Sequence, residues 1–119
     1  MDDRELLELA AKAAGMEVWT DIDGNLYTSM QDLIEKSWNP LTDDGDALRL
    51  AVKIGMGVLY ETQEFMGGRV VEVSYNIDED EGTCKVVTER LGDDPYAATR
   101  RAIVRAAAET ARQEKDHDR

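Results

Sequence analysis

Apolar residues recur every three or four positions in three segments of the chain and alternate with polar residues in much of the rest. The first of these segments predicts a helix over residues 4–14. Asp2 or Asp3 can cap its first amides, and Gly15 is placed to end it. The apolar stripe of this helix consists of Leu6, Leu9, Ala10 and Ala13.

The second helical segment begins near Asp43 and ends at Gly55. Asp43, with Asp46 three residues later, resembles a capping box with a shorter acid, and both acids suit the positive end of the helix dipole. The residues predicted to form the buried side of this helix are Ala47, Leu48, Ala51, Val52 and Ile54.

The third helical segment starts with Asp94 as its cap and Pro95 in its first position, where no backbone N–H is needed. The helical pattern continues to about Glu114. Residues 1–114 are therefore expected to form one domain, and residues 115–119 are expected to be a frayed tail.

Strands are predicted where apolar and polar residues alternate. A hairpin with an Asp-Gly-Asn turn is predicted over residues 17–29. Three further strands, over residues 56–63, 69–76 and 83–90, are expected to pair as an antiparallel meander. Residues 31–36 are predicted to form a short helical turn.

The resulting order of elements is α-β-β-α-β-β-β-α. Each helix has one apolar face to bury against a sheet, which favours a layered fold of the α/β (α+β) class. We therefore expect a three-layer α/β/α sandwich built on a mostly antiparallel sheet.

Composition and charge narrow the classes of function. No apolar run approaches the roughly 20 residues that cross a bilayer, and the N-terminus lacks the basic start of a signal peptide, so a cytoplasmic protein without membrane contact is expected. The formal net charge is −12, and all of the negative excess lies before residue 90. Such a chain repels the phosphate backbone of nucleic acids and favours a basic protein partner, unless the charge serves only solubility.

No catalytic or metal-binding signature is present in the sequence. His117 is the only histidine and Cys84 the only cysteine, too few for a zinc site or a hydrolase triad, and Cys84 is predicted to be a small packed residue. The acidic segments 21–25 and 78–81 are interpreted as exposed turns, because the first lacks the glycine and glutamate positions of a calcium loop. A protein that is not an enzyme and holds no metal or cofactor is expected, with carboxylate-only catalysis as the least supported alternative.

Arg100 lies at the border of the apolar face of the last predicted helix, about 60° from Ile103 at about 100° per residue. A guanidinium there requires a carboxylate, a carbonyl group or an anionic ligand. Two interpretations follow: a salt bridge to one of the acids in residues 43–46, or an anion site at which Arg100 binds phosphate or carboxylate. Trp38 likewise either packs in the core, or stacks on a base or anchors a protein interface.

Two segments of the chain together resemble the phage ABA-sandwich family. They are Trp-Asn-Pro-Leu at residues 38–41 with Asp-Gly-Asp-Ala-Leu at residues 44–48, and the run Asp-Pro-Tyr-Ala-Ala-Thr-Arg-Arg-Ala-Ile-Val-Arg-Ala-Ala at residues 94–107. The family consists of small proteins encoded by tailed phages and prophages. The resemblance implies a three-layer α/β/α sandwich and a phage accessory role without a defined activity.

A counter-defence role in the bacterial host follows from this resemblance, with two competing mechanisms. In the first, the protein sequesters a nucleotide immune signal, such as a cyclic oligonucleotide or an ADP-ribose derivative, and is a homodimer or larger homo-oligomer. In the second, its acidic surface inhibits a basic host or defence protein, as a nucleic-acid-mimicking anti-CRISPR does. A structural role in the phage particle is a further alternative. The residues expected to bind the nucleotide are Arg100 and Arg101 for phosphate, Trp38 or Tyr96 for stacking, and Asn39 or Asp46 for base or ribose edges.

Overall fold

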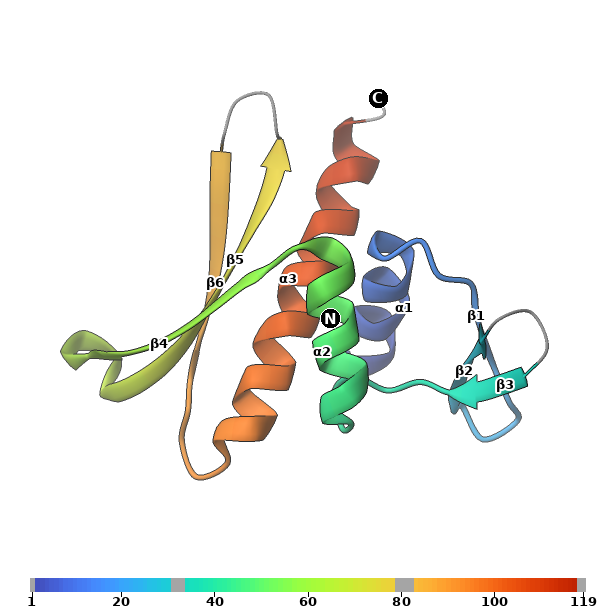
Figure 1. The fold of residues 1–119 in the computed structure, drawn as a ribbon, viewed down its shortest axis with the longest axis horizontal. Helices are drawn as coiled ribbons and strands as arrows, with labels where there is room; N and C mark the ends of the chain where they lie inside the picture. The colour runs from blue at the N-terminus through green and yellow to red at the C-terminus, as the bar shows by residue number, and fades with distance from the viewer. Residues whose placement is uncertain (1, 31–33, 79–82, 118–119) are drawn as a thin grey trace.

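The computed structural model describes residues 2–30, 34–78 and 83–117, which form a mixed α+β fold (Figure 1). Its helices are α1 (Asp3–Ala13), α2 (Asp44–Ile54), α3 (Pro95–His117) and a short 3-10 helix, η1 (Glu64–Met66). Its strands are β1 (Val18–Thr20), β2 (Leu26–Met30), β3 (Ile34–Ser37), β4 (Gly57–Gln63), β5 (Gly68–Asp78) and β6 (Thr83–Arg90). None of the helices in the described residues combines the length and the apolar content that crossing a membrane requires.

Aspartate side chains cap the three long helices of the described residues, as the sequence predicts. Each carboxylate accepts a hydrogen bond from the backbone N–H three residues later, which satisfies one of the free donors of the first turn. The capped pairs are Asp2 with Glu5 at 2.8 Å, Asp43 with Asp46 at 2.8 Å, and Asp94 with Ala97 at 3.0 Å. Helix α3 continues three residues beyond the predicted end at Glu114, and residues 118–119 of the predicted frayed tail lie outside the described part.

The strands form two antiparallel sheets, β1-β2-β3 and β4-β5-β6. The predicted hairpin is confirmed, and its turn is closed by Asp21, whose carboxylate accepts hydrogen bonds from the backbone N–H groups of Asp23 and Asn25, each at 2.9 Å. The predicted meander of β4, β5 and β6 is also confirmed, with uninterrupted pairing from Gly57 opposite Ser74 to the end of β4.

The predicted helical turn at residues 31–36 is wrong where the structure describes it. Ile34–Ser37 form β3, which pairs with β2, so three strands rather than two separate α1 from α2. A single helical turn has little stability of its own, whereas the edge of β2 offers a ladder of backbone hydrogen bonds. Residues 31–33 lie outside the described part.

The layers also differ from the expected α/β/α sandwich. Helix α3 packs against β5 and β6 on one side and against α1 and α2 on the other (Figure 1), so the helices gather on one side of the larger sheet. The reason is the small size of the residues on α3, which lets α1 approach it closely and buries α3 from two directions. The fully or almost fully buried residues of α3 are Ala102, Ile103, Val104, Ala106, Ala107, Ala108 and Ala111.

Trp38 joins the smaller sheet to this core. Its side chain is 5% exposed, and its backbone N–H donates to the carbonyl oxygen of Leu26 in β2 at 2.9 Å. The core-packing interpretation of Trp38 is therefore confirmed. The chain then turns through the fully buried Pro40 into α2.

Candidate functional site

The six residues predicted to bind a nucleotide do not gather in one place. Trp38 and Asn39 line a polar cavity of about 500 Å³ between α1, β2 and the segment before α2. Tyr96 and Arg100 line a different, mainly apolar groove of about 330 Å³. Trp38 and Arg100, both expected to bind the nucleotide, therefore line different cavities.

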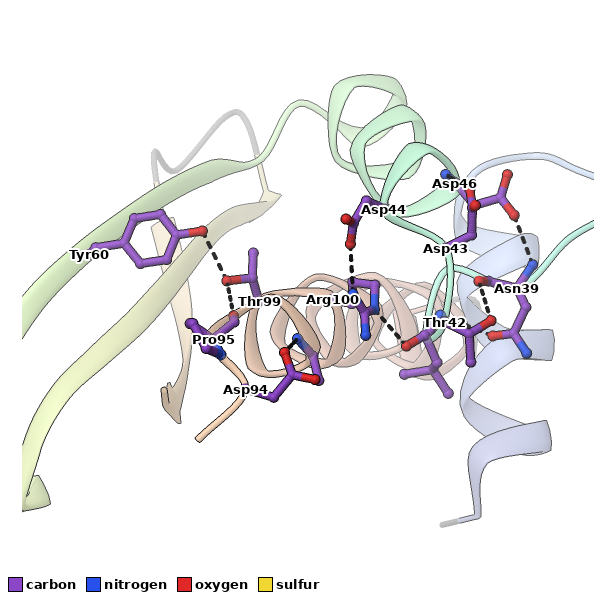
Figure 2. A network of polar contacts seen from close by, with 12 residues as sticks. Asn39, Thr42, Asp43, Asp44, Asp46, Tyr60, Asp94, Pro95, Thr99 and Arg100 are labelled. Atoms are coloured by element: carbon purple, nitrogen blue, oxygen red, sulfur yellow. Dashed lines mark hydrogen bonds and ion pairs between the residues drawn. The ribbon is translucent and has the colours of Figure 1, made fainter. Parts of the chain in front are cut away.

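Arg100 makes the salt bridge that the sequence offers as one of its two interpretations (Figure 2). Its Nη1 donates to Oδ1 of Asp44 at 2.7 Å, and its Nε donates to the carbonyl oxygen of Leu41 at 2.8 Å. The side chain is only 16% exposed. Arg100 therefore connects α3 to the start of α2 through two hydrogen bonds.

Asn39 and Asp46 are joined by a hydrogen bond at the turn before α2. The backbone N–H of Asn39 donates to Oδ2 of Asp46 at 3.0 Å, and Arg49 donates to Oδ1 of Asp46 at 2.7 Å (Figure 2 shows the first contact). The Oδ1 atom of Asn39 accepts from the backbone N–H of Leu41 at 3.0 Å. Because Asp46 is buried, these bonds hold the turn before α2 in one conformation.

The remaining predicted residues lie on the surface. Arg101 is paired with Asp3 of α1, with 3.3 Å between the charged atoms. Tyr96 is exposed at the start of α3 and is the one predicted aromatic residue that a ligand can reach. Cys84 is exposed as well, so the prediction of a packed residue is wrong; it lies near the start of the edge strand β6.

The groove that contains Tyr96 and Arg100 is the strongest candidate site. Helix α2 contributes Ala47, Leu48 and Ala51 with Asp44, strand β4 contributes Val58 and Tyr60, and α3 contributes Tyr96, Thr99, Arg100 and Ile103. The hydroxyl groups of Tyr60 and Thr99 are 2.9 Å apart, and Thr99 donates to the carbonyl oxygen of Pro95 at 2.8 Å (Figure 2). These contacts connect β4 to the N-terminal part of α3 at this end of the groove.

The groove exists because α3 covers only part of the inner face of the larger sheet. Val58 and Tyr60 of β4 stand opposite Val73 and Val71 of β5, on the same face of the sheet. The β5 residues have no exposed surface, whereas Val58 and Tyr60 are 39% and 48% exposed. The apolar inner face of β4 therefore lacks the cover that α3 gives to β5.

Helix α2 exposes apolar side chains that the sequence predicts to be buried in the core. Leu48 and Val52 were predicted on its buried side, but they are 64% and 72% exposed, and Leu50 takes the buried place together with Ala47. Sequence reasoning missed the groove for this reason. One sequence feature does indicate the exposed apolar surface. Val58-Leu59-Tyr60 is an apolar run without alternation, and the strand that carries it has solvent on both faces.

The outer face of the same sheet carries two carboxylates close together. The Nε2 of Gln63 donates to Glu61 and also to Oε1 of Glu72, the latter at 2.6 Å. The pKa of Glu72 is raised above its ordinary value of 4.5, mainly by the hydrogen bond with Glu61 and next by desolvation, while Gln63 acts in the opposite direction. This pair is a local excess of negative charge beside the edge of the sheet.

Replacing Glu72 with glutamine should raise the melting temperature near neutral pH. A carboxyl group whose pKa is raised by folding stabilises the fold while it is protonated, below the ordinary pKa of 4.5, and loses that contribution as the pH rises through the folded-state pKa. The gain of Glu72→Gln should therefore disappear in melts recorded below this value. Glu17→Gln, an equal charge change at an exposed position, is the control, and an equal gain in both variants would contradict the interpretation.

Within the described residues, no cluster of three or more histidine, cysteine, aspartate or glutamate side chains is placed to hold a metal ion. The predicted exposed turn at residues 78–81 lies mostly outside the described part. The chain matches no protein-family model, and no curated protein and no solved structure matches it.

Proposed function

We propose that this protein is a non-catalytic binding protein whose groove between α2, β4 and α3 docks a positively charged partner protein. The observation that carries the proposal is the gathering of exposed large apolar side chains around one groove. Exposed apolar patches of this kind mark interaction sites, and tyrosine is enriched among the residues that dominate binding. The residues concerned are Leu48, Val58, Tyr60 and Tyr96.

The charge of the chain supports a basic partner. The net charge is −12, and the acid that lines the groove, Asp44, is largely exposed beside its partner Arg100. Complementary charge speeds the encounter of two proteins and excludes partners of the same sign. The groove therefore fits a partner whose basic surface carries protruding apolar side chains.

Binding without chemistry is part of the proposal. The described residues that line the groove include neither histidine nor cysteine, and the carboxylate among them, Asp44, is paired with Arg100. A general base needs a free acceptor near the reacting group. The resemblance to the phage ABA-sandwich family suggests the setting: a cytoplasmic host or defence protein is the partner, and occupation of its basic surface inhibits it.

Sequestration of a nucleotide has less support from the geometry. Four of the six predicted residues lie elsewhere, and Arg100 already has a carboxylate and a carbonyl partner. Tyr96 and Arg100 both line the groove, so nucleotide binding can be tested there. A thermal-shift measurement with cyclic dinucleotides and ADP-ribose derivatives, with and without Tyr96→Ala, performs that test.

Leu48→Asp should abolish partner binding, because it places a charge in the apolar groove while the exposed site leaves the fold intact. The immobilised protein and its variant are exposed to bacterial lysate, and retained proteins are identified and quantified by mass spectrometry. We expect basic proteins that are retained by the wild type and reduced roughly tenfold or more by the variant, which corresponds to about 1.4 kcal/mol of binding energy.

Ile22→Asp is the matched control, since Ile22 is fully exposed in the β1–β2 turn and does not line the groove. It should retain the same proteins as the wild type. Equal retention by all three proteins, or retention of acidic proteins only, would argue against the groove as the binding surface. A raised salt concentration should weaken genuine complexes, since screening reduces the attraction between the charged surfaces.

A further inference from the structure

We propose that the partner contributes an extended segment, which pairs with the free edge of β4 as an added strand and alternates apolar with basic side chains. The inference rests on the proposed function and specifies how the partner is held. Three observations support it: the unpaired backbone edge of β4, the apolar inner face of that strand, and the pair Glu61 and Glu72 on the outer face of the sheet.

The edge of β4 is open and unprotected. In the order β4-β5-β6, β4 is an outer strand, and among the described residues only β5 pairs with it. Edge strands usually carry lysine, proline or a bulge that blocks further pairing. Strand β4 has none of the three, and its pairing with β5 is regular throughout; the opposite edge strand, β6, carries Lys85 and meets β5 with a register shift between Asn76 and Asp78.

The inner face of β4 would accept the apolar side chains of an added strand. Side chains of neighbouring strands lie about 5 Å apart on the same face, so those of the added strand would stand beside Val58 and Tyr60. Helix α2 presents Leu48 and Val52 to solvent, and in Figure 1 α2 lies in front of α3 while β4 lies in front of β5 and β6. An added strand at β4 would cover exposed apolar surface from both elements.

The outer face of β4 would accept the basic side chains. Leu59, Glu61 and Gln63 point to this face because residues alternate along a strand, and Glu72 lies on the same face of β5. Glu61 and Glu72 share one amide donor, Gln63, so a lysine or arginine opposite Glu61 would supply charge that the pair lacks. An alternating apolar and basic segment therefore matches both faces at once.

A second copy of this chain is a poorer match. It would bring another net charge of −12 to the edge and set a second Glu61 and Glu72 pair beside the first. A helix is also a poorer match, because its backbone groups are bonded internally and leave the donors and acceptors of β4 unused. Both occupants remain distinguishable outcomes of the experiment.

The test uses a synthetic peptide of about nine residues, the length of a strand, that alternates lysine with valine or tyrosine. Two further peptides carry backbone N-methyl groups, one on every apolar residue and the other on every lysine. Successive N–H groups of a strand point to opposite edges, so only one of these peptides loses the donors that face β4. We expect that peptide to bind roughly tenfold or more weakly and the other to bind within about twofold of the parent.

The remaining outcomes overturn the inference. Loss of binding with both methylated peptides indicates a helical or irregular segment, and unchanged binding with both indicates side-chain contacts alone. Failure of the parent peptide to bind, or sedimentation of the free protein as a dimer that Tyr60→Lys dissociates, also rules it out. If a helical basic peptide binds and Leu48→Asp prevents it, the proposed function stands while the strand mode fails.

The acidic pair provides a second readout on the same parent peptide. Glu61→Gln and Glu72→Gln should each weaken its binding severalfold and reduce the salt dependence, whereas the exposed control Glu17→Gln should change neither. Glu72→Gln should at the same time stabilise the free fold, so weaker binding by this variant cannot result from unfolding. Equal effects of all three substitutions would indicate general charge attraction and would contradict the proposed register of alternating side chains.

Discussion

Replacing Trp38 with alanine should lower the free energy of unfolding by about 3–5 kcal/mol, because it leaves a cavity where a large buried side chain joins the smaller sheet to the core. That loss is a large part of the about 5–15 kcal/mol that stabilises an ordinary domain. It corresponds to a decrease of roughly 10–20 °C in the melting temperature. Urea denaturation followed by far-ultraviolet circular dichroism measures the change without relying on tryptophan emission.

Trp19→Ala is the matched control for Trp38→Ala. Trp19 lies on the three-residue strand β1 and is 38% exposed, so its loss should cost about 1 kcal/mol. The comparison also tests the predicted role of Trp38 in stacking on a base. A Trp38→Ala variant with the stability of the wild type and reduced nucleotide binding would restore that role and contradict the packing described here.

Removing the carboxylate of Asp46 should lower the free energy of unfolding by about 3 kcal/mol, because hydrogen bonds to a charged group contribute about 1.5–3 kcal/mol each. Asp46→Ala leaves the backbone N–H of Asn39 without its acceptor and Arg49 without its closest carboxylate. The turn between Trp38 and α2 would lose the contact that holds its shape. Chemical denaturation of the variant and the wild type at the same pH measures this loss.

Asp44→Ala is the control for Asp46→Ala, since both residues lie in the first turn of α2 and the charge change is equal. Asp44 is 69% exposed, and without it the largely buried Arg100 still donates to the carbonyl oxygen of Leu41, so the loss should cost about 1 kcal/mol. Equal destabilisation by the two substitutions would indicate that helix-dipole electrostatics, rather than the buried contacts of Asp46, stabilise this turn.

Arg100 and Asp46 show which features of a site can be predicted from the sequence and which cannot. The position of Arg100 on the helix wheel predicts that its guanidinium needs a partner, and the salt bridge to Asp44 was one of the two predicted solutions. The sequence cannot choose between a protein carboxylate and a ligand, because the choice depends on how α2 lies against α3. Asn39 and Asp46 were assigned to a ligand for the same reason: their mutual hydrogen bond requires the folded turn.

Features that depend on residues a few positions apart can be predicted from the sequence alone. The aspartate caps, the hairpin over residues 17–29 and the strands of the larger sheet are predicted because capping, turn formation and strand alternation are local. Which apolar surfaces are covered is known only from the way the elements pack together. Alanines let α3 lie between α1 and the sheet, where it covers β5 and β6 but leaves β4 uncovered beside Leu48. Burial depends on the placement of distant elements, so a groove left by incomplete cover has no local signature.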